Sequence, residues 1–302
     1  MHGKIAFVGA GNMGRPMIRH LVAAGYRVTV SVRRPESLAA VVALGAEAAD
    51  SPAAAARDAS FICTNVTSTL DVDEVLLGAQ GAARTAPAGA LCVDFSTISP
   101  LAVRDIASRV EALGHSFLDA PVSGGVAGAE AASLSIMVGG RAEVFERGRP
   151  LLQILGRVVT HVGDSGAGQI AKACNQIVQV VTIEGIAEAM YFAAALGGDL
   201  PKILSSISAG MAGSKMLDLM GPKMAARDFR AGIEARLHAK DFGLVCDVAR
   251  QAGLELPAAE RVRTQLARLL EHGWGAQDTS SLLRVLEADG RHRAMPCNGY
   301  DQ

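Results

Sequence analysis

Near its start the chain passes from an apolar run through a glycine-rich turn into a helical pattern. Residues 4–8 (KIAFV) predict a buried strand, and the turn that follows reads GAGNMG from Gly9 to Gly14. Apolar residues at helical spacing then continue towards Gly25. A strand, a glycine turn and a helix in this order are typical of parallel α/β sheets that bind a dinucleotide.

The glycines of this turn have separate predicted roles. Gly9 permits a tight turn, Gly11 lets the backbone approach a pyrophosphate, and Gly14 lets the helix pack closely against the strand. Asn12 and Met13 complete the loop, and the free N–H groups of the helix start can bind phosphate oxygens. The alternative is an ordinary turn between a strand and a helix.

The end of the second predicted strand, residues 27–32, indicates which dinucleotide is bound. NAD-selective sites usually place Asp or Glu there to accept hydrogen bonds from the ribose 2′-hydroxyl. This chain instead has Ser31, Arg33 and Arg34, and no carboxylate between positions 31 and 34. Two guanidinium groups match a 2′-phosphate. The sequence therefore favours NADP(H), with NAD(H) possible, and the alternative is a solvated turn with incidental arginines.

Strands and helices continue to alternate up to about residue 162. Further strands are predicted at 60–64, 90–95, 116–120, 133–139 and 158–162, with helices at 71–77 and 101–113. Such βα alternation predicts a doubly wound, mainly parallel sheet. Ligands bind at the carboxyl edge of such a sheet, where Thr97 follows the strand at 90–95.

A second glycine-rich stretch, APVSGG at residues 120–125, follows the strand at 116–120. Ser123 offers a hydroxyl, and the amides of Gly124 and Gly125 can form a concave nest for an anion. We expect a substrate carboxylate there. A flexible glycine turn is the alternative.

From Gly166 onward the chain is almost entirely helical. The first helix is expected at about 168–196, and it carries Lys172, Asn175 and Gln176 close to its start. A helix turns about 100° per residue, so these three side chains share one face. An ammonium group and two amides on one face can hold and protonate a carbonyl oxygen. The alternative is a surface lysine beside two capping amides.

These patterns divide the chain into a dinucleotide-binding domain at 1–164, an all-helical domain at 165–290 and a loose tail at 291–302. Later helices are expected near 214–226, 237–252, 257–272 and 278–289. Lys240 and Asp241 are placed at the start of the helix at 237–252.

Composition excludes several classes of protein. The net charge of the 302 residues is -1, so no basic surface indicates nucleic acid. Apolar stretches are interrupted before membrane-spanning length, and no secretion signal is recognised, so we expect a cytoplasmic protein without membrane contact. The five cysteines are scattered and the histidines form no metal pair. We expect no metal, a core position for Cys174, and surface or loop positions for His161 and His238.

Five ordered blocks together resemble the β-hydroxyacid dehydrogenase family, which includes 3-hydroxyisobutyrate dehydrogenase. The resemblance covers about residues 4–289 and rests on GAGNMG, DFSTISP at 94–100, DAPVSGG at 119–125, GAGQIAKACNQ at 166–176 and LHAKDF at 237–242. It implies a Rossmann domain followed by an all-helical domain, assembled as a homodimer or homotetramer.

The same resemblance implies roles for individual residues. Lys172 matches the catalytic acid/base, and Ser123 to Gly125 match the residues that hold the substrate carboxylate. Asn175 matches the asparagine that orients substrate and lysine, with Gln176 beside it. Thr97 and Lys240 match positions along the nicotinamide end of the cofactor.

Within the family, Asn175-Gln176, GMAGS at 210–214 and LHAKD resemble the tartronate semialdehyde (2-hydroxy-3-oxopropionate) reductase branch. That branch often has an Asp at the second strand end, where this chain has Val32-Arg33-Arg34. The alternatives are a 3-hydroxyisobutyrate dehydrogenase, or a succinic or glyoxylic semialdehyde reductase. A non-catalytic nucleotide-binding protein and an imine reductase are disfavoured because Lys172 is present.

Overall fold

The computed structural model describes residues 3–32 and 36–291. The chain divides into two compact units, Met1–Cys174 and Asn175–Gln302. The division falls inside the long helix α8 (Ala167–Ala195), whereas the sequence places the domain boundary just before that helix. A continuous helix thus contributes its first turns to one unit and the rest to the other. Of the tail expected at 291–302, all but Arg291 lies outside the described residues.

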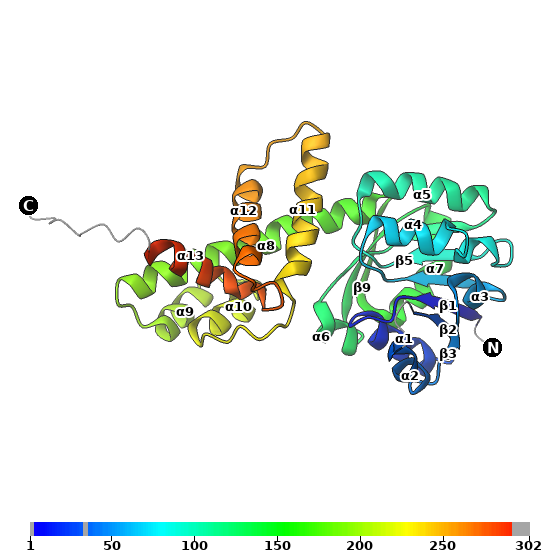
Figure 1. Cartoon of the computed structure of the whole chain (residues 1–302), viewed down its shortest axis with the longest axis horizontal. Coiled ribbons are helices and arrows are strands. Elements are labelled where there is room, and N and C mark those ends of the chain that lie inside the picture. Colours follow the sequence, from blue (N-terminus) through cyan, green and yellow to red (C-terminus); the bar gives the residue numbers. More distant parts are fainter. Residues whose placement is uncertain (1–2, 33–35, 292–302) are drawn as a thin grey trace, which may run out of the picture. The chain divides into compact units, whose positions relative to one another are not determined.

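The first unit is built on a nine-stranded sheet in order β3-β2-β1-β4-β5-β6-β8-β7, with β9 paired to β8. The six strands from β3 to β6 in this order are parallel, whereas β8 runs antiparallel to β6 and β7. The prediction of a doubly wound, mainly parallel sheet is confirmed (Figure 1). The strands are β1 (Lys4–Val8), β2 (Arg27–Ser31), β3 (Glu47–Ala49), β4 (Phe61–Thr64), β5 (Leu91–Asp94), β6 (Ser116–Asp119), β7 (Val122–Ser123), β8 (Leu134–Gly139) and β9 (Gly156–Gly163).

Helices cover both faces of this sheet because its strands are buried on both sides. Apolar residues of α1 and α7 join one core with the sheet, and those of α3, α4 and α5 join the other. The helices of this unit are α1 (Gly14–Ala23), α2 (Glu36–Val42), α3 (Pro52–Ala56), α4 (Thr69–Leu77), α5 (Pro100–Ala112), α6 (Gly125–Glu130) and α7 (Ala142–Leu155), with a 3-10 turn at Ala82–Arg84.

Strand β1 lies at the point where the sheet changes its winding direction. The chain moves outward from β1 to β2 and β3, then returns to place β4 on the other side of β1. The loops that leave the carboxyl ends of β1 and β4 therefore diverge, and a crevice opens between them.

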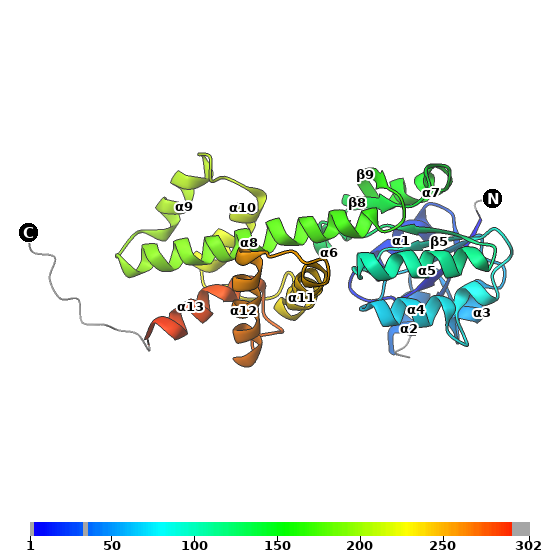
Figure 2. The ribbon, with the colours of Figure 1, turned by 90° about the horizontal axis from the view of Figure 1, so that it is seen from above.

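The second unit is all helical, as predicted, and Figure 2 shows α9 and α10 on one side of α8 and α11 to α13 on the other. Buried residues of these helices, among them Val180, Ile183, Met190, Phe242 and Leu266, form one core. The later helices are α9 (Leu200–Ser208), α10 (Lys215–Ala225), α11 (Ala235–Gln251), α12 (Pro257–Glu271) and α13 (Leu282–Arg291), the last preceded by a 3-10 turn at Thr279–Ser281.

Helix α8 is long and apolar for a reason that lies in this core. The helix has 29 residues, and an 18-residue window within it reaches a mean hydropathy of 1.4, so by length and composition alone the helix would be able to cross a membrane. Val180, Ile183, Ala187 and Met190, however, are completely buried in the helical unit. A core helix of a globular domain accounts for this composition, and the expectation of no membrane contact stays a prediction.

Candidate active site

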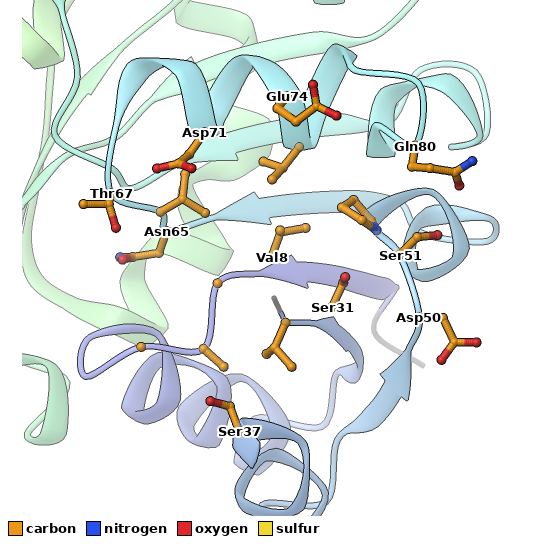
Figure 3. Close-up of a pocket in the computed structure, with 17 residues that line it drawn as sticks. Val8, Ser31, Ser37, Asp50, Ser51, Asn65, Thr67, Asp71, Glu74 and Gln80 are labelled. Atoms are coloured by element: carbon orange, nitrogen blue, oxygen red, sulfur yellow. The ribbon is translucent and has the colours of Figure 1, made fainter. Parts of the chain in front are cut away.

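A cavity of about 510 Å³ opens at the carboxyl ends of β1, β2 and β4 in the first unit. The loop after β1 lines it through Gly9 and Gly11, and Ser31 lines it from the end of β2 (Figure 3). Helix α4 borders one side of the cavity and α2 borders the other. This is the crevice where a doubly wound sheet holds a dinucleotide.

The glycine turn has the shape that a dinucleotide requires. A Cβ atom at Gly9, where φ is +102°, would collide with the carbonyl of Asn65, and one at Gly14 would collide with the carbonyl of Gly9. A Cβ atom at Gly11 would meet no protein atom within 4 Å. Gly9 and Gly14 are therefore fixed by packing, whereas Gly11 leaves open space beside the backbone. That space suits a pyrophosphate, so these residues fit the cofactor.

Sequence reasoning missed the part of this cavity that follows β4. Asn65 and Thr67 line it from the loop after that strand, and Asp71 and Glu74 line it from α4 (Figure 3). The position of Asn65 and Thr67 beyond a predicted strand was a usable signal, because ligands bind at that edge of the sheet. Asp50, beyond β3, adds a third carboxylate to the lining.

Of the three residues that favour NADP(H), the structure describes only Ser31. Ser31 is 5 % exposed and lies at the end of β2, as expected, and Ser37 of α2 also lines the cavity. Arg33 and Arg34 lie outside the described residues. Their contact with a 2′-phosphate therefore stays a prediction, as do the cofactor contacts of Asn12 and Met13.

The proposed carboxylate loop has an unusual backbone. Gly124 and Gly125 have φ angles of +135° and +62°, a region that residues with a Cβ atom rarely adopt. Ser123, half-buried, ends β7 and pairs with Ser135 of β8. Gly125 is also the first residue of α6, and the binding of a substrate carboxylate by this loop stays a prediction.

The polar face near the start of α8 has the expected residues in place. Lys172 is 7 % exposed and Gln176 is 2 % exposed, so neither is a surface side chain. Asn175 donates from Nδ2 to the Oε1 atoms of Gln176 and Gln179, at 3.0 and 3.2 Å. The reading of this stretch as a surface lysine beside capping amides is therefore wrong.

Lys240 and its neighbour lie inside α11 instead of at its start. Helix α11 begins at Ala235, so Asp241 is in its second turn, and the prediction of an amino-terminal position is wrong. The Asp241 carboxylate lies 2.7 Å from Lys240 Nζ and accepts a hydrogen bond from Gln176. Thr97, the other residue predicted at the nicotinamide end, is half-buried in the loop after β5.

A network of buried polar groups connects the strand ends to α8, and the sequence analysis did not predict it. Asp119, the last residue of β6, accepts hydrogen bonds from the backbone amides of Gly166 and Gln169 at 2.8 and 2.9 Å. The Gln169 side chain accepts from the amide of Ile98 and donates to the carbonyl of Ser96, at 3.1 and 2.8 Å. Asp119 and Gln169 are almost completely buried.

Burial raises the pKa values of Asp119 and of a second carboxyl group, Asp94, which accepts a hydrogen bond from the amide of Ser96 at 3.1 Å. The pKa of Asp119 is raised to about 6, mainly by loss of solvent, while the amides of Gly166 and Gln169 lower it in part. The pKa of Asp94, at the end of β5, is also raised to about 6 by burial. Its Oδ1 accepts from the Thr64 hydroxyl at 2.7 Å, whereas Oδ2 finds no partner among the groups that the structure describes.

Three other predictions about single residues are wrong. Cys174 is exposed on α8, because the buried faces of that helix lie at other positions. His238 is 3 % exposed, and its Nδ1 lies 2.7 Å from the Thr279 hydroxyl oxygen. His161 lies within β9, half-buried, with Nε2 2.7 Å from the carbonyl oxygen of Gly140.

Residues 3–32 and 36–291 contain no cluster of three or more His, Cys, Asp or Glu side chains able to hold a metal ion.

Two family profiles match successive parts of the chain. The NAD binding domain of 6-phosphogluconate dehydrogenase matches residues 4–163. The NAD-binding domain of NADP-dependent 3-hydroxyisobutyrate dehydrogenase matches residues 166–286. The chain belongs to the 3-hydroxyisobutyrate dehydrogenase (β-hydroxyacid dehydrogenase) family. It is therefore an NAD(P)-dependent oxidoreductase that acts on the CH–OH group of hydroxy acids.

Individual relatives differ in their substrates. The chain is 36 % identical to 2-hydroxy-3-oxopropionate reductase of Escherichia coli, over 96 % of this chain and 99 % of that protein. It is 34 % identical to the NAD-dependent L-serine dehydrogenase of Pseudomonas aeruginosa, over 94 % of this chain and 98 % of that protein. The structure of Mycobacterium tuberculosis 3-hydroxyisobutyrate dehydrogenase with L-serine superposes with a TM-score of 0.88, at 32 % identity, covering 95 % of this chain and 99 % of that one.

Proposed function

We propose that this chain interconverts a small aldehyde acid and its hydroxy acid with NADP(H), and that it reduces 2-hydroxy-3-oxopropionate to glycerate. The observation that carries the proposal is the buried Lys172, which is followed on the same helix face by the amides of Asn175 and Gln176. Amides can hydrogen-bond a 2-hydroxyl group, whereas an apolar face would suit a 2-methyl group. The identity to the E. coli reductase supports the same choice.

Each residue has a defined part in this reaction. The amides of Gly124 and Gly125 and the hydroxyl of Ser123 bind the substrate carboxylate, and Asn175 orients the carbonyl group. When bound, the nicotinamide supplies the hydride. Lys172 donates the proton from Nζ to the carbonyl oxygen, and its positive charge stabilises the negative charge that develops there. In the oxidative direction the neutral Lys172 amine accepts that proton from the hydroxyl group.

A second candidate reaction is the oxidation of another 3-hydroxy acid. The L-serine dehydrogenase relative, and the solved 3-hydroxyisobutyrate dehydrogenase with L-serine, favour this alternative. Glycerate, L-serine and 3-hydroxyisobutyrate each carry a CH2OH group on the carbon next to the carboxylate. The same carboxylate loop and the same lysine serve all three, so the substituent on that carbon decides between them. Succinic semialdehyde and glyoxylate are further candidate substrates.

Steady-state oxidation of NADPH and NADH tests the proposal. The compounds tested for reduction are 2-hydroxy-3-oxopropionate, methylmalonate semialdehyde, succinic semialdehyde, glyoxylate and a cyclic imine. Glycerate, 3-hydroxyisobutyrate and L-serine are tested for oxidation with the oxidised cofactors. We expect the highest kcat/KM for 2-hydroxy-3-oxopropionate with NADPH. Lys172→Ala should lose about 10²–10⁴-fold in kcat while it still binds NADPH. Near-normal turnover in that variant would remove Lys172 from the mechanism, and a preference for another substrate would replace the first assignment.

We also propose that the protein is a cytoplasmic homodimer or homotetramer that contacts neither nucleic acid nor membrane. Large apolar side chains in α8 and just after it support self-association, since Val178 and Phe192 of α8 are 69 % and 67 % exposed and Leu196, the next residue after the helix, is 71 % exposed. Light scattering coupled to gel filtration measures the mass of the particle. Phe192→Asp should shift it towards the monomer, and a monomeric unsubstituted protein would contradict the assembly.

A further inference from the structure

We propose that Asp119 and Gln169 are positioning residues, which place Lys172 relative to the carboxylate loop at 123–125 and to the loop that carries Thr97. The inference rests on the proposed role of Lys172 as the acid. Neither residue belongs to the substrate or cofactor contacts predicted from the sequence. Asp119, Gln169, Lys172 and both loops lie within the unit Met1–Cys174.

Asp119 connects β6 to the start of α8. Its Oδ1 accepts from the Gly166 amide at 2.8 Å, and its Oδ2 accepts from the Gln169 amide at 2.9 Å. Both carboxylate oxygens are thus used to orient the first turn of the helix. Because Asp119 is four residues before Ser123, one residue fixes both the strand end that leads into the carboxylate loop and the helix that carries Lys172.

The surrounding backbone leaves room for this carboxylate only because two glycines face it. A Cβ atom at Gly139 would lie 2.5 Å from Asp119 Oδ1, and one at Gly168 would lie 2.8 Å from Oδ2. Real side chains do not approach so closely, so the helix start, β8 and the Asp119 side chain fit together in one arrangement. Such close packing restricts the position of the helix.

Gln169 connects the same helix turn to the loop after β5. The amide of Ile98 donates to its Oε1 at 3.1 Å, and its Nε2 donates to the carbonyl of Ser96 at 2.8 Å. The two bonds enclose Thr97, which the family resemblance places beside the nicotinamide. The loop is fixed from its other side as well, because the Ser96 hydroxyl accepts from the amide of Val66 at 2.9 Å.

Lys172 lies three residues beyond Gln169, almost one helical turn further along nearly the same face. Its Cα position is therefore determined by the turn that Asp119 and Gln169 hold. Proton transfer and charge stabilisation depend steeply on distance, and a displacement of about 1 Å can cost about 10²-fold in rate. The two residues act on the reaction through Lys172 and do not touch the substrate.

Double-mutant cycles test this inference. Asp119→Asn leaves one of the two amides facing an NH2 group, and Gln169→Met removes both bonds to the loop at similar volume. Each should lower kcat about 10- to 100-fold and leave the Kd for NADPH within about twofold. When the same substitutions are introduced into the Lys172→Ala enzyme, they should alter its residual kcat by less than about twofold. The effects of substitutions are not additive when the residues act through the same group.

Matched controls are Asp164→Asn and Gln153→Met, which make the same chemical changes at exposed positions, one just before α8 and one on α7. The inference would be overturned if Asp119→Asn or Gln169→Met lowered kcat by the same factor with Lys172 present and in the Lys172→Ala enzyme. It would also be overturned if either of these two substitutions alone left kcat at the wild-type value. If Asp119→Asn does not fold, Gln169→Met decides the outcome alone. A Lys172→Ala enzyme with near-normal turnover would instead contradict the proposed function, so the two failures are distinguishable.

Discussion

Gln176 of α8 donates a hydrogen bond from Nε2 to Asp241 Oδ2 of α11 at a distance of 3.0 Å. The other oxygen of that carboxylate lies 2.7 Å from Lys240 Nζ. An amide that the sequence places at the substrate is therefore also a structural link between two helices of the helical unit. Its removal would leave the Asp241 carboxylate without one of its partners.

This relationship predicts that Gln176→Met lowers the free energy of unfolding by about 1–3 kcal/mol, because a largely buried acceptor loses its donor. Urea denaturation followed by circular dichroism measures the change. Gln251→Met, at the exposed end of α11, serves as the control and should stay within about 0.5 kcal/mol of the unsubstituted chain. Equal stability of the two variants would contradict a structural role for Gln176.

The glycine turn offers two substitutions with opposite expected effects. Gly11→Ala should leave the melting temperature unchanged, because its methyl group meets no protein atom within 4 Å, yet it should weaken NADPH binding about tenfold or more. Gly14→Ala should destabilise the fold by about 1–3 kcal/mol, because its methyl group collides with the carbonyl of Gly9. Calorimetry and fluorescence titration separate the two effects. Unchanged NADPH affinity in Gly11→Ala would place the pyrophosphate elsewhere.

The preference for NADPH over NADH is tested by substituting the two arginines that follow β2 in the sequence. Arg33→Ala combined with Arg34→Ala should raise the Kd for NADPH about tenfold or more and change that for NADH by less than about twofold. Only NADPH carries the 2′-phosphate, and each charge-assisted hydrogen bond contributes about 1.5–3 kcal/mol. Arg57→Ala, on the same unit, is the control. Equal losses for both nucleotides would show that the arginines are bystanders.

The core of the helical unit contains a carboxyl group that makes its stability depend on pH. Glu184 of α8 is 5 % exposed, and its carboxylate oxygens find no hydrogen-bond partner in the described part of the chain. Burial, and then the nearby Glu188, raise its pKa from an ordinary 4.5 to about 7. The Gln265 amide nearby lowers the pKa in part but makes no well-formed hydrogen bond with it.

Between pH 4.5 and about 7 the folded state therefore holds a proton that the unfolded state has released, so stability falls as the pH rises through this range. Glu184→Gln should raise the melting temperature by several degrees at pH 8 and by much less at pH 5. Glu271→Gln, at an exposed position on α12, should produce no such difference. A stabilisation that is the same at both pH values would show that Glu184 does not take up this proton.

Local sequence patterns were sufficient to predict the elements that neighbouring residues define. The apolar run of β1, the glycine turn after it and the helical period of α8 are each set by neighbouring residues, and the structure places them within a few residues of the prediction. The same reasoning selected Lys172 and the loop at 123–125, whose roles stay predictions. The predictions of a core position for Cys174 and of a helix-start position for Asp241 were wrong. The burial of a helical side chain and its hydrogen-bond partners depend on which other helices pack against that side of the helix.

The contacts between groups that are distant in the sequence depend on how the elements pack in the folded chain. Asp119 and Gln169 are 50 positions apart, and Gln169 and Ser96 are 73 apart, so no local period relates them. Their contact arises because β5 and β6 are neighbours in the sheet and α8 begins beside their carboxyl ends. Hydrogen bonds act over about 3 Å, whereas sequence patterns report only which face of an element is buried. The identity of the strand that lies beside each helix start is a property of the folded chain.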